Sequence, residues 1–136
     1  MCVEGRPQVD DAGNVRFFDG RFADGYLQRE APARGYSTVR WRGRHVADVS
    51  EMTPQEMADY WLEVAQVARA LTEAFTPCHL NYELLGNAVP HVHTHIVPRY
   101  LDDPCPNMPL KPWEPVEVPA AELSADAARL RAVFTT

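Results

Sequence analysis

The feature that most constrains the fold is a run in which every second residue is a histidine: His91, His93 and His95. The residues between them, Val92 and Thr94, are β-branched, and such residues favour strands. Alternate side chains of a strand lie on the same face of a sheet. The pattern therefore predicts a strand over 91–97 whose imidazoles share one face, open to a ligand, while the other face packs against the rest of the protein.

A long helix is predicted ahead of this strand, because its start signals are complete. Thr53 and Glu56 have the spacing of a capping box, Pro54 stands at the first helical position, and Pro77 ends the segment. Apolar residues recur through it at spacings of three and four: Met57, Trp61, Val64, Ala68, Leu71 and Phe75. We expect this stripe to cover the β-branched face of the histidine strand.

Most of the other periodic segments have the pattern of strands. They cover residues 14–18, 21–22, 26–29, 36–42 and 80–84. Asp19-Gly20, between the first two, suits a tight hairpin turn. Because strands outnumber helices and two of their links have hairpin length, the predicted class is α+β with a mostly antiparallel sheet.

The C-terminal part of the chain is rich in proline. Six of the twelve prolines fall between Pro104 and Pro119, which excludes a helix or a central strand there. We expect residues 101–119 to form an ordered strap on the body, anchored by Met108, Leu110, Trp113, Val116 and Val118. A short helix over about 121–134 follows, with Pro119 and Ser124 both usable as its start. At 136 residues, the chain is predicted to be a single domain, 1–136.

Composition excludes several classes of protein. Thirteen basic and nineteen acidic residues leave a net charge of −6, which argues against a nucleic-acid polymer as partner. No apolar run approaches the roughly 18 residues of a membrane span, and the start of the chain lacks a signal-peptide core. Three widely spaced cysteines without a C-x-x-C pair indicate reduced thiols. We therefore expect a cytoplasmic protein that does not bind membranes.

The spacing of the histidines bears on their chemistry. Strand positions two apart are separated by roughly 6.5–7 Å, so His91 and His95 lie about 13 Å apart. One zinc ion, with Zn–N bonds of about 2 Å, is able to hold an adjacent pair but hardly all three. A row of imidazoles fits an elongated anion such as a polyphosphate better, since the central ring can attack phosphorus while its neighbours donate hydrogen bonds. A structural role and a zinc site are the alternatives.

The segment from His91 to Val97 resembles the histidine-triad motif, His-φ-His-φ-His-φ-φ, with Thr94 in place of one hydrophobic residue. The flanking segments, Asn81 to Pro90 and Pro98-Arg99, are similar to the surroundings of this motif in the HIT family, and the resemblance covers about residues 24–113. It implies a HIT-like α+β fold with a five-stranded, mostly antiparallel sheet, one long helix and a homodimer. Family members hydrolyse or transfer nucleotidyl groups of dinucleoside polyphosphates, nucleoside phosphoramidates or related adenylated compounds.

The resemblance also implies roles for single residues. His93 would be the nucleophile that forms a nucleotidyl-histidine intermediate, and His95 would contact the α-phosphate or the bridging oxygen. His91 would support the central ring, with its carbonyl accepting the proton on the non-attacking nitrogen of His93. Asn87 matches the position that faces the leaving group, and Asn81 matches the amide that binds phosphate.

Other positions differ from the family pattern or carry a weaker signal. Tyr36 replaces a frequent histidine and is assigned to the substrate, as is Arg99, for which pairing with an acid is the alternative. Gln28-Arg29-Glu30 stands where many members hold the ribose through an acidic residue or asparagine. Cys2 and His45 supply at most half of the structural zinc site of some bacterial relatives, so neither a metal nor another cofactor is predicted.

Together these features predict a homodimeric HIT-like hydrolase or transferase. Its substrate would be a purine nucleotide recognised through its AMP moiety, and the reaction would pass through a covalent intermediate on His93 without a metal. The alternative is a HIT module that binds nucleotides without turnover. A metal-dependent hydrolase that uses two of the histidines is a third possibility.

Overall fold

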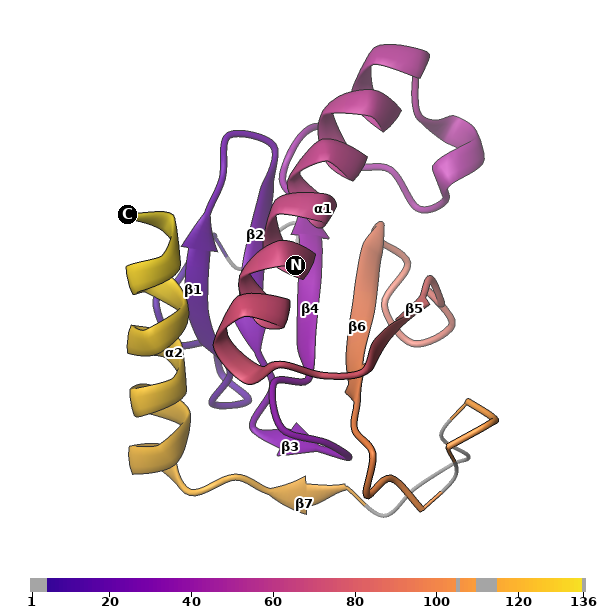
Figure 1. Ribbon diagram of the computed structural model, residues 1–136. Coiled ribbons are helices and arrows are strands. Elements are labelled where there is room, and N and C mark those ends of the chain that lie inside the picture. The colour runs from indigo at the N-terminus through magenta and orange to yellow at the C-terminus, as the bar shows by residue number, and fades with distance from the viewer. Residues whose placement is uncertain (1–4, 105, 110–114, 136) are drawn as a thin grey trace.

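The histidine strand lies inside a five-stranded antiparallel sheet in the computed structural model, which describes residues 5–104, 106–109 and 115–135 (Figure 1). The strands are β1 (Val15–Asp19), β2 (Ala23–Leu27), β3 (Glu30–Ala31), β4 (Ser37–Trp41), β5 (His79–Glu83), β6 (His93–Arg99) and β7 (Val116–Glu117). The helices are α1 (Pro54–Phe75) and α2 (Ala120–Phe134), preceded by a short 3-10 helix at Val49–Glu51. The sheet order is β1-β2-β4-β6-β5, and every neighbouring pair is antiparallel. The predicted fold class is confirmed.

Helix α1 begins and ends where the sequence predicts. The Thr53 hydroxyl accepts from the Glu56 amide at 3.1 Å, and the Glu56 carboxylate accepts from the Thr53 amide at 2.9 Å. At the other end Thr76 adopts the left-handed conformation with φ of 49°, and Pro77 follows. The capping box and the proline stop therefore fix both ends of the helix.

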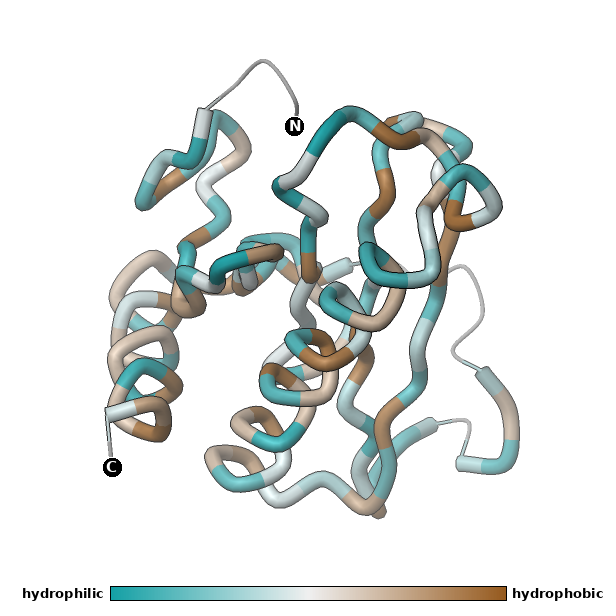
Figure 2. The backbone as a smooth tube through the Cα atoms, turned by 90° about the horizontal axis from the view of Figure 1, so that it is seen from above, coloured by the Kyte–Doolittle hydropathy of each residue, from teal (hydrophilic) through white to brown (hydrophobic). Residues whose placement is uncertain are grey.

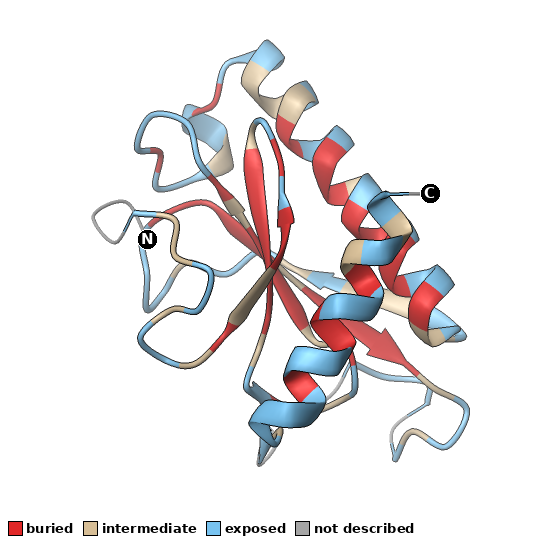
Figure 3. Cartoon of the chain, turned by 90° about the vertical axis from the view of Figure 1, so that its left-hand side faces the viewer, coloured by how far each residue is buried: buried red, intermediate tan, exposed pale blue. Residues whose placement is uncertain are grey.

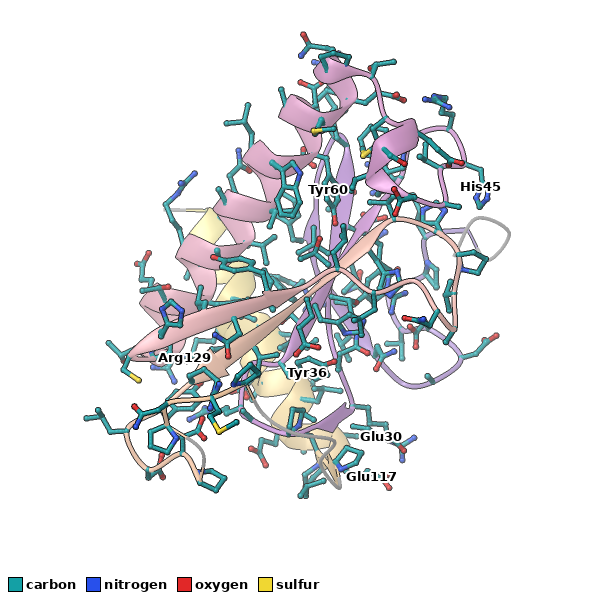
Figure 4. The ribbon with its side chains drawn as sticks, turned by 90° about the vertical axis from the view of Figure 1, so that its right-hand side faces the viewer. Glu30, Tyr36, His45, Tyr60, Glu117 and Arg129 are labelled. Carbon is teal, nitrogen blue, oxygen red and sulfur yellow. The ribbon has the colours of Figure 1, made fainter. Side chains whose placement is uncertain are left out.

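The buried face of α1 differs from the prediction by one residue. Trp61 was expected to face the core but is 37% exposed, whereas Tyr60 is fully buried (Figure 4). The physical reason is that the Tyr60 hydroxyl has buried partners: it donates to the Val39 carbonyl at 2.8 Å and is 2.7 Å from the Thr94 hydroxyl. Trp61 packs edge-on against the Tyr60 ring, with centroids 5.3 Å apart. The expectation that α1 lies behind the histidine strand is confirmed.

The buried positions of both helices face the same side of the sheet (Figure 3). Helix α2 contributes a buried stripe of Leu123, Ala127 and Leu130. Glu63 of α1 is buried as well, and its carboxylate accepts from the backbone amides of Arg21 at 2.8 Å and Phe22 at 3.0 Å. A buried carboxylate thus fastens the β1–β2 turn to the long helix.

The C-terminal segment is attached through its backbone rather than through the expected anchors. Strand β7 pairs with β3, and the Val118 amide donates to the Arg29 carbonyl at 2.7 Å. Val118 packs against the core, but Met108 and Val116 are exposed, so their predicted role as anchors is wrong. The other two predicted anchors, Leu110 and Trp113, lie outside the described residues. Helix α2 starts at Ala120, directly after Pro119.

Residues 5–14 cross the face of the sheet that the helices leave open (Figures 2 and 3). The Tyr26 hydroxyl donates to the Pro7 carbonyl at 2.6 Å, and Arg6 pairs with Asp24 at 2.7 Å. This segment therefore covers the β1–β2 end of the open face. In the described part of the chain, neither helix is both long and apolar enough to span a bilayer.

Candidate active site

The three histidines lie on the open face of the sheet, opposite the helices. The predicted strand over 91–97 starts later in the structure, at His93, because the Val92 amide donates to the Val46 carbonyl of the loop before α1 at 2.9 Å instead of to a strand. His93 is paired with Arg40 of β4, and His95 is paired with Thr38 of β4 on one side and with Glu83 of β5 on the other. His91 and His93 are buried, and His95 is partly exposed. The row is therefore less open than its sequence suggests.

The central ring is held by its neighbour's backbone. Nδ1 of His93 is 2.7 Å from the carbonyl oxygen of His91, which is the contact that the family resemblance implies. A carbonyl only accepts, so Nδ1 carries the proton and Nε2 of the neutral ring keeps its lone pair. Burial lowers the pKa of His93, and the charge of Arg40 acts in the same direction. His93 is thus a neutral ring with one unprotonated nitrogen at pH 7.

The His91 ring is fixed at the other end of the row. Its Nε2 forms a hydrogen bond with the Trp41 carbonyl, and its Nδ1 lies 3.4 Å from Nδ1 of the exposed His45. Burial lowers the pKa of His91. Within residues 5–104, 106–109 and 115–135, no three His, Cys, Asp or Glu side chains are arranged to hold a metal ion. Cys2, the possible partner of His45, lies outside these ranges.

His95 has a phenol as its partner. The Tyr36 hydroxyl is 2.6 Å from Nδ1 of His95, and the two rings stack with centroids 5.7 Å apart. Burial lowers the pKa of His95 to about 4, and positive charge on His93, when that ring is protonated, and on Arg40 acts in the same direction. Burial also raises the pKa of Tyr36 to about 12, and Glu83 acts in the same direction. Tyr36 and His45 therefore mark opposite ends of the row (Figure 4).

Beyond His93, towards β2, the open face is polar. The Arg40 guanidinium pairs with Asp10 at 2.9 Å and lies over the Tyr26 ring, 3.9 Å from its centroid. The Gln28 amide donates to the Thr38 hydroxyl at 2.8 Å. Sequence reasoning missed Arg40 as a site residue, although Arg40 stands between the apolar Val39 and Trp41 in the predicted strand 36–42, an alternation that is typical of a polar face.

A pocket of about 420 Å³ adjoins this end of the row. Arginines on three segments contribute to its lining, together with an aromatic ring and two histidines: Arg6, Arg40, Arg42, Tyr26, His45 and His91. The pocket is large enough for a polar group of a ligand next to the histidines. The positive charges of Arg6 and Arg40 are partly neutralised by the carboxylates that pair with them.

Asn81 and Arg99 come together at the other end of β5 and β6. Asn81 Oδ1 accepts from Arg99 at 2.6 Å, and Arg99 pairs with Asp103 at 2.5 Å. Arg99 is buried, so the pairing with an acid that the sequence offered as the alternative is present as an internal ion pair. Asn87 is exposed on the loop between β5 and β6. The structure thus gathers the histidines and Tyr36 in one row, and it places Asn81 with Arg99 in a separate cluster.

Comparison with known proteins identifies similar chains. The model of the HIT domain matches residues 25–102. Protein hit of Bacillus subtilis is 27% identical over 104 residues, which are 73% of this chain and 71% of that protein. The asymmetrical bis(5'-nucleosyl)-tetraphosphatase of Schizosaccharomyces pombe is 33% identical over 61 residues, 41% of this chain and 34% of that protein. The crystal structure of a histidine triad protein from Bradyrhizobium japonicum superposes with a TM-score of 0.76 at 23% identity, covering 88% of this chain and 89% of that one.

Proposed function

This chain belongs to the HIT domain family, and we propose from that premise that it hydrolyses or transfers nucleotidyl groups through a covalent intermediate on His93. One observation carries the proposal: the hydrogen bond from Nδ1 of His93 to the His91 carbonyl leaves Nε2 as the unprotonated nitrogen. A neutral imidazole with a fixed tautomer is a competent nucleophile at neutral pH.

The proposed reaction has two displacements at the α-phosphorus. In the first, the lone pair of His93 Nε2 forms a P–N bond while the bond from phosphorus to the leaving group breaks and the leaving group takes up a proton from solvent. In the second, water attacks phosphorus and releases one proton to solvent, the P–N bond breaks, and the nucleoside monophosphate leaves with His93 restored to its neutral form. Neither step needs an oxidant, a reductant or a metal ion.

We propose a purine nucleotide as the substrate, bound through its AMP moiety, with a dinucleoside polyphosphate or a nucleoside phosphoramidate as the class. The name of the fission-yeast relative, a bis(5'-nucleosyl)-tetraphosphatase, supports the first of these. A row of imidazoles along a strand suits a chain of phosphates, because the His93 and His95 rings, with centroids 5.0 Å apart, can contact different oxygen atoms of one elongated anion. In this proposal Asn81, Asn87 and Arg99 bind the substrate, Tyr36 belongs to the substrate site through its contact with His95, and no metal takes part.

A nucleotide-binding module without turnover is the second candidate. It is favoured by one feature of the polar face: the Gln28 amide, in the stretch where relatives hold the ribose, is engaged by Thr38. Such a module would bind AMP and form no covalent intermediate.

The test measures AMP release from diadenosine polyphosphates and from adenosine phosphoramidate, with a chelator present. We expect turnover by the native chain and a loss of at least about 1000-fold in His93→Ala, because the nucleophile is gone. Gln66→Ala is the control: Gln66 is exposed on α1, on the side of the sheet away from the histidines, and should leave the rate unchanged. An alkaline quench should trap labelled AMP on the native protein only. AMP binding without turnover would overturn the proposal in favour of the binding module, and loss of the rate in chelator would favour a metal enzyme.

We also propose that the protein is a homodimer formed through the β5 edge of the sheet. β5 is an outer strand, so one side of its backbone is not paired within the sheet. Apolar side chains are exposed on β5, just beyond its end and on the adjoining part of α1: Tyr82, Leu84, Trp61 and Leu62. An unpaired strand edge beside apolar surface is a template for pairing with another chain, and a second copy supplies an edge of the same kind.

A further inference from the structure

The hydrogen bond between Tyr36 and His95 has two possible directions. Either the phenol donates to Nδ1 of His95, or Nδ1–H donates to the phenol oxygen. The direction matters because a neutral imidazole has one ring proton. If the phenol donates, the proton of His95 is on Nε2; if Nδ1 donates, Nε2 holds a lone pair and has nothing to give to a phosphate.

The length of the bond favours the phenol as donor. The oxygen and Nδ1 are 2.6 Å apart. That distance is below the range of about 2.7–3.2 Å for N–H···O bonds, which would apply if Nδ1 donated, and bonds donated by a hydroxyl are the shorter class, about 2.5–3.0 Å for O–H···O. The relative acidities agree, since a phenol gives up a proton far more readily than a neutral imidazole N–H and an imidazole nitrogen is the stronger base.

The surroundings keep both partners neutral at pH 7. Burial raises the pKa of Tyr36 to about 12 and lowers the pKa of His95 to about 4. Among the residues that the structure describes, the charged groups that act on this pair are Glu83 on β5, whose charge holds the Tyr36 proton on the phenol, and Arg40 on β4, whose charge opposes protonation of His95. His93, the neighbour on β6, acts on His95 in the same sense as Arg40. A neutral phenol therefore meets a neutral imidazole.

We propose that Tyr36 is a positioning residue that holds His95 in the tautomer with its proton on Nε2. The inference deepens the proposed function, on which its catalytic consequence rests. Adjacent rings of the row would then have opposite tautomers, set by different partners: the His91 carbonyl leaves a lone pair on Nε2 of His93, and the Tyr36 hydroxyl leaves a proton on Nε2 of His95. One ring attacks phosphorus, and the next donates a hydrogen bond to a phosphate oxygen.

The tautomer is measured in the free protein, so this test does not depend on any activity. Nitrogen NMR of the chain labelled in histidine distinguishes a protonated ring nitrogen from one that accepts a hydrogen bond. We expect Nδ1 of His95 to be an unprotonated acceptor in the native chain, and its resonance to move to the position of a free lone pair in Tyr36→Phe, which keeps the stacked ring. Tyr100→Phe is the matched control, because it loses a phenol that donates to the Arg34 carbonyl at 2.7 Å and should leave His95 unchanged. A proton on Nδ1 in the native chain would overturn the proposal.

Kinetics test the consequence for the reaction. In Tyr36→Phe we expect kcat to fall about 10- to 100-fold while KM stays within about twofold, since the donor is misaligned but its ring remains. A rise in KM with kcat unchanged would contradict the positioning role and indicate that the hydroxyl binds substrate directly. If the native chain shows no turnover, the proposed function fails, and the NMR result still decides the assignment of Tyr36.

Discussion

At the scale of single residues, Arg40 is the group that most changes the environment of the proposed nucleophile. It faces His93 across the β4–β6 pair, and it is itself held by Asp10 of the N-terminal segment and by the Tyr26 ring. Burial of the His93 ring lowers its pKa, and the positive charge of Arg40 acts in the same direction. Activity should therefore persist below the ordinary histidine pKa of about 6.5, down to the lowered pKa of His93.

Arg40→Gln should raise the pKa of His93, because a nearby positive charge is removed while the ring stays buried. We expect the acid limb of the pH profile of kcat/KM to move to higher pH by about half a unit to one unit. The neighbouring histidines His91 and His95 remain in the variant, and so does Asp10, which loses its ion-pair partner. Arg129→Gln removes the same charge on α2, which lies on the opposite side of the sheet from the row, and serves as control (Figure 3). Equal shifts in both variants would point to a general effect of net charge instead.

The sequence identified the histidines but not Arg40 for a physical reason. Alternation along one segment fixes which residues share a face of that strand, and this was enough for His91, His93 and His95. Contact between Arg40 and His93 depends on which strands are neighbours and in what register, and a single sequence carries no direct record of either.

At the scale of secondary structure, the C-terminal end of α1 stores strain. Thr76 has a φ of 49°, a conformation that costs about 1–2 kcal/mol for a residue with a side chain and is easy for glycine. Thr76 is exposed, so its side chain contributes little packing.

Thr76→Gly should raise the free energy of unfolding by about 1 kcal/mol, because the strain is relieved at the helix end. Urea denaturation followed by circular dichroism measures the change. Thr72→Gly, one turn earlier within the helix, should have the opposite sign and lower stability by about 0.5–1 kcal/mol. If Thr76→Gly is the less stable of the two variants, the strain is not the controlling feature of this end.

The elements were predictable to different degrees. The ends of α1 follow from local chemistry, namely a capping box and a proline, and these need no tertiary information. The predicted buried face of α1 was wrong by one position because Tyr60 and Trp61 are adjacent large aromatic residues. Tyr60 is the buried one because its hydroxyl finds hydrogen-bond partners on Val39 and Thr94, which the sequence of the helix does not show. The anchors of the C-terminal strap were mistaken because a backbone pairing between β3 and β7 holds it, and two-residue strands leave no periodic signal.

At the scale of the whole molecule, the β5 edge should govern assembly. Sedimentation equilibrium of the native chain should give twice the chain mass. Tyr82→Asp places a charge in the middle of the proposed interface and should raise the dissociation constant at least about 100-fold, since a buried unpaired charge costs several kcal/mol.

Val9→Asp is the matched control for this assembly test. It introduces the same charge at a valine that is 55% exposed beside β1, at the opposite edge of the sheet. A native chain that sediments as a monomer, or equal effects of the two substitutions, would contradict the proposed dimer.

The hydroxyl of Tyr60 has a consequence for how a ligand would be accommodated. It reaches through the sheet's inner side to the Val39 carbonyl on β4 and the hydroxyl of Thr94, the residue between His93 and His95 on β6. The Tyr60 side chain thereby links β4 and β6 on the helix side of the sheet, behind the centre of the row. The spacing of the imidazoles is therefore fixed by the sheet. Adjustment to substrates of different length falls to the segments around the row: the loop that carries Asn87, residues 5–14 and the C-terminal segment.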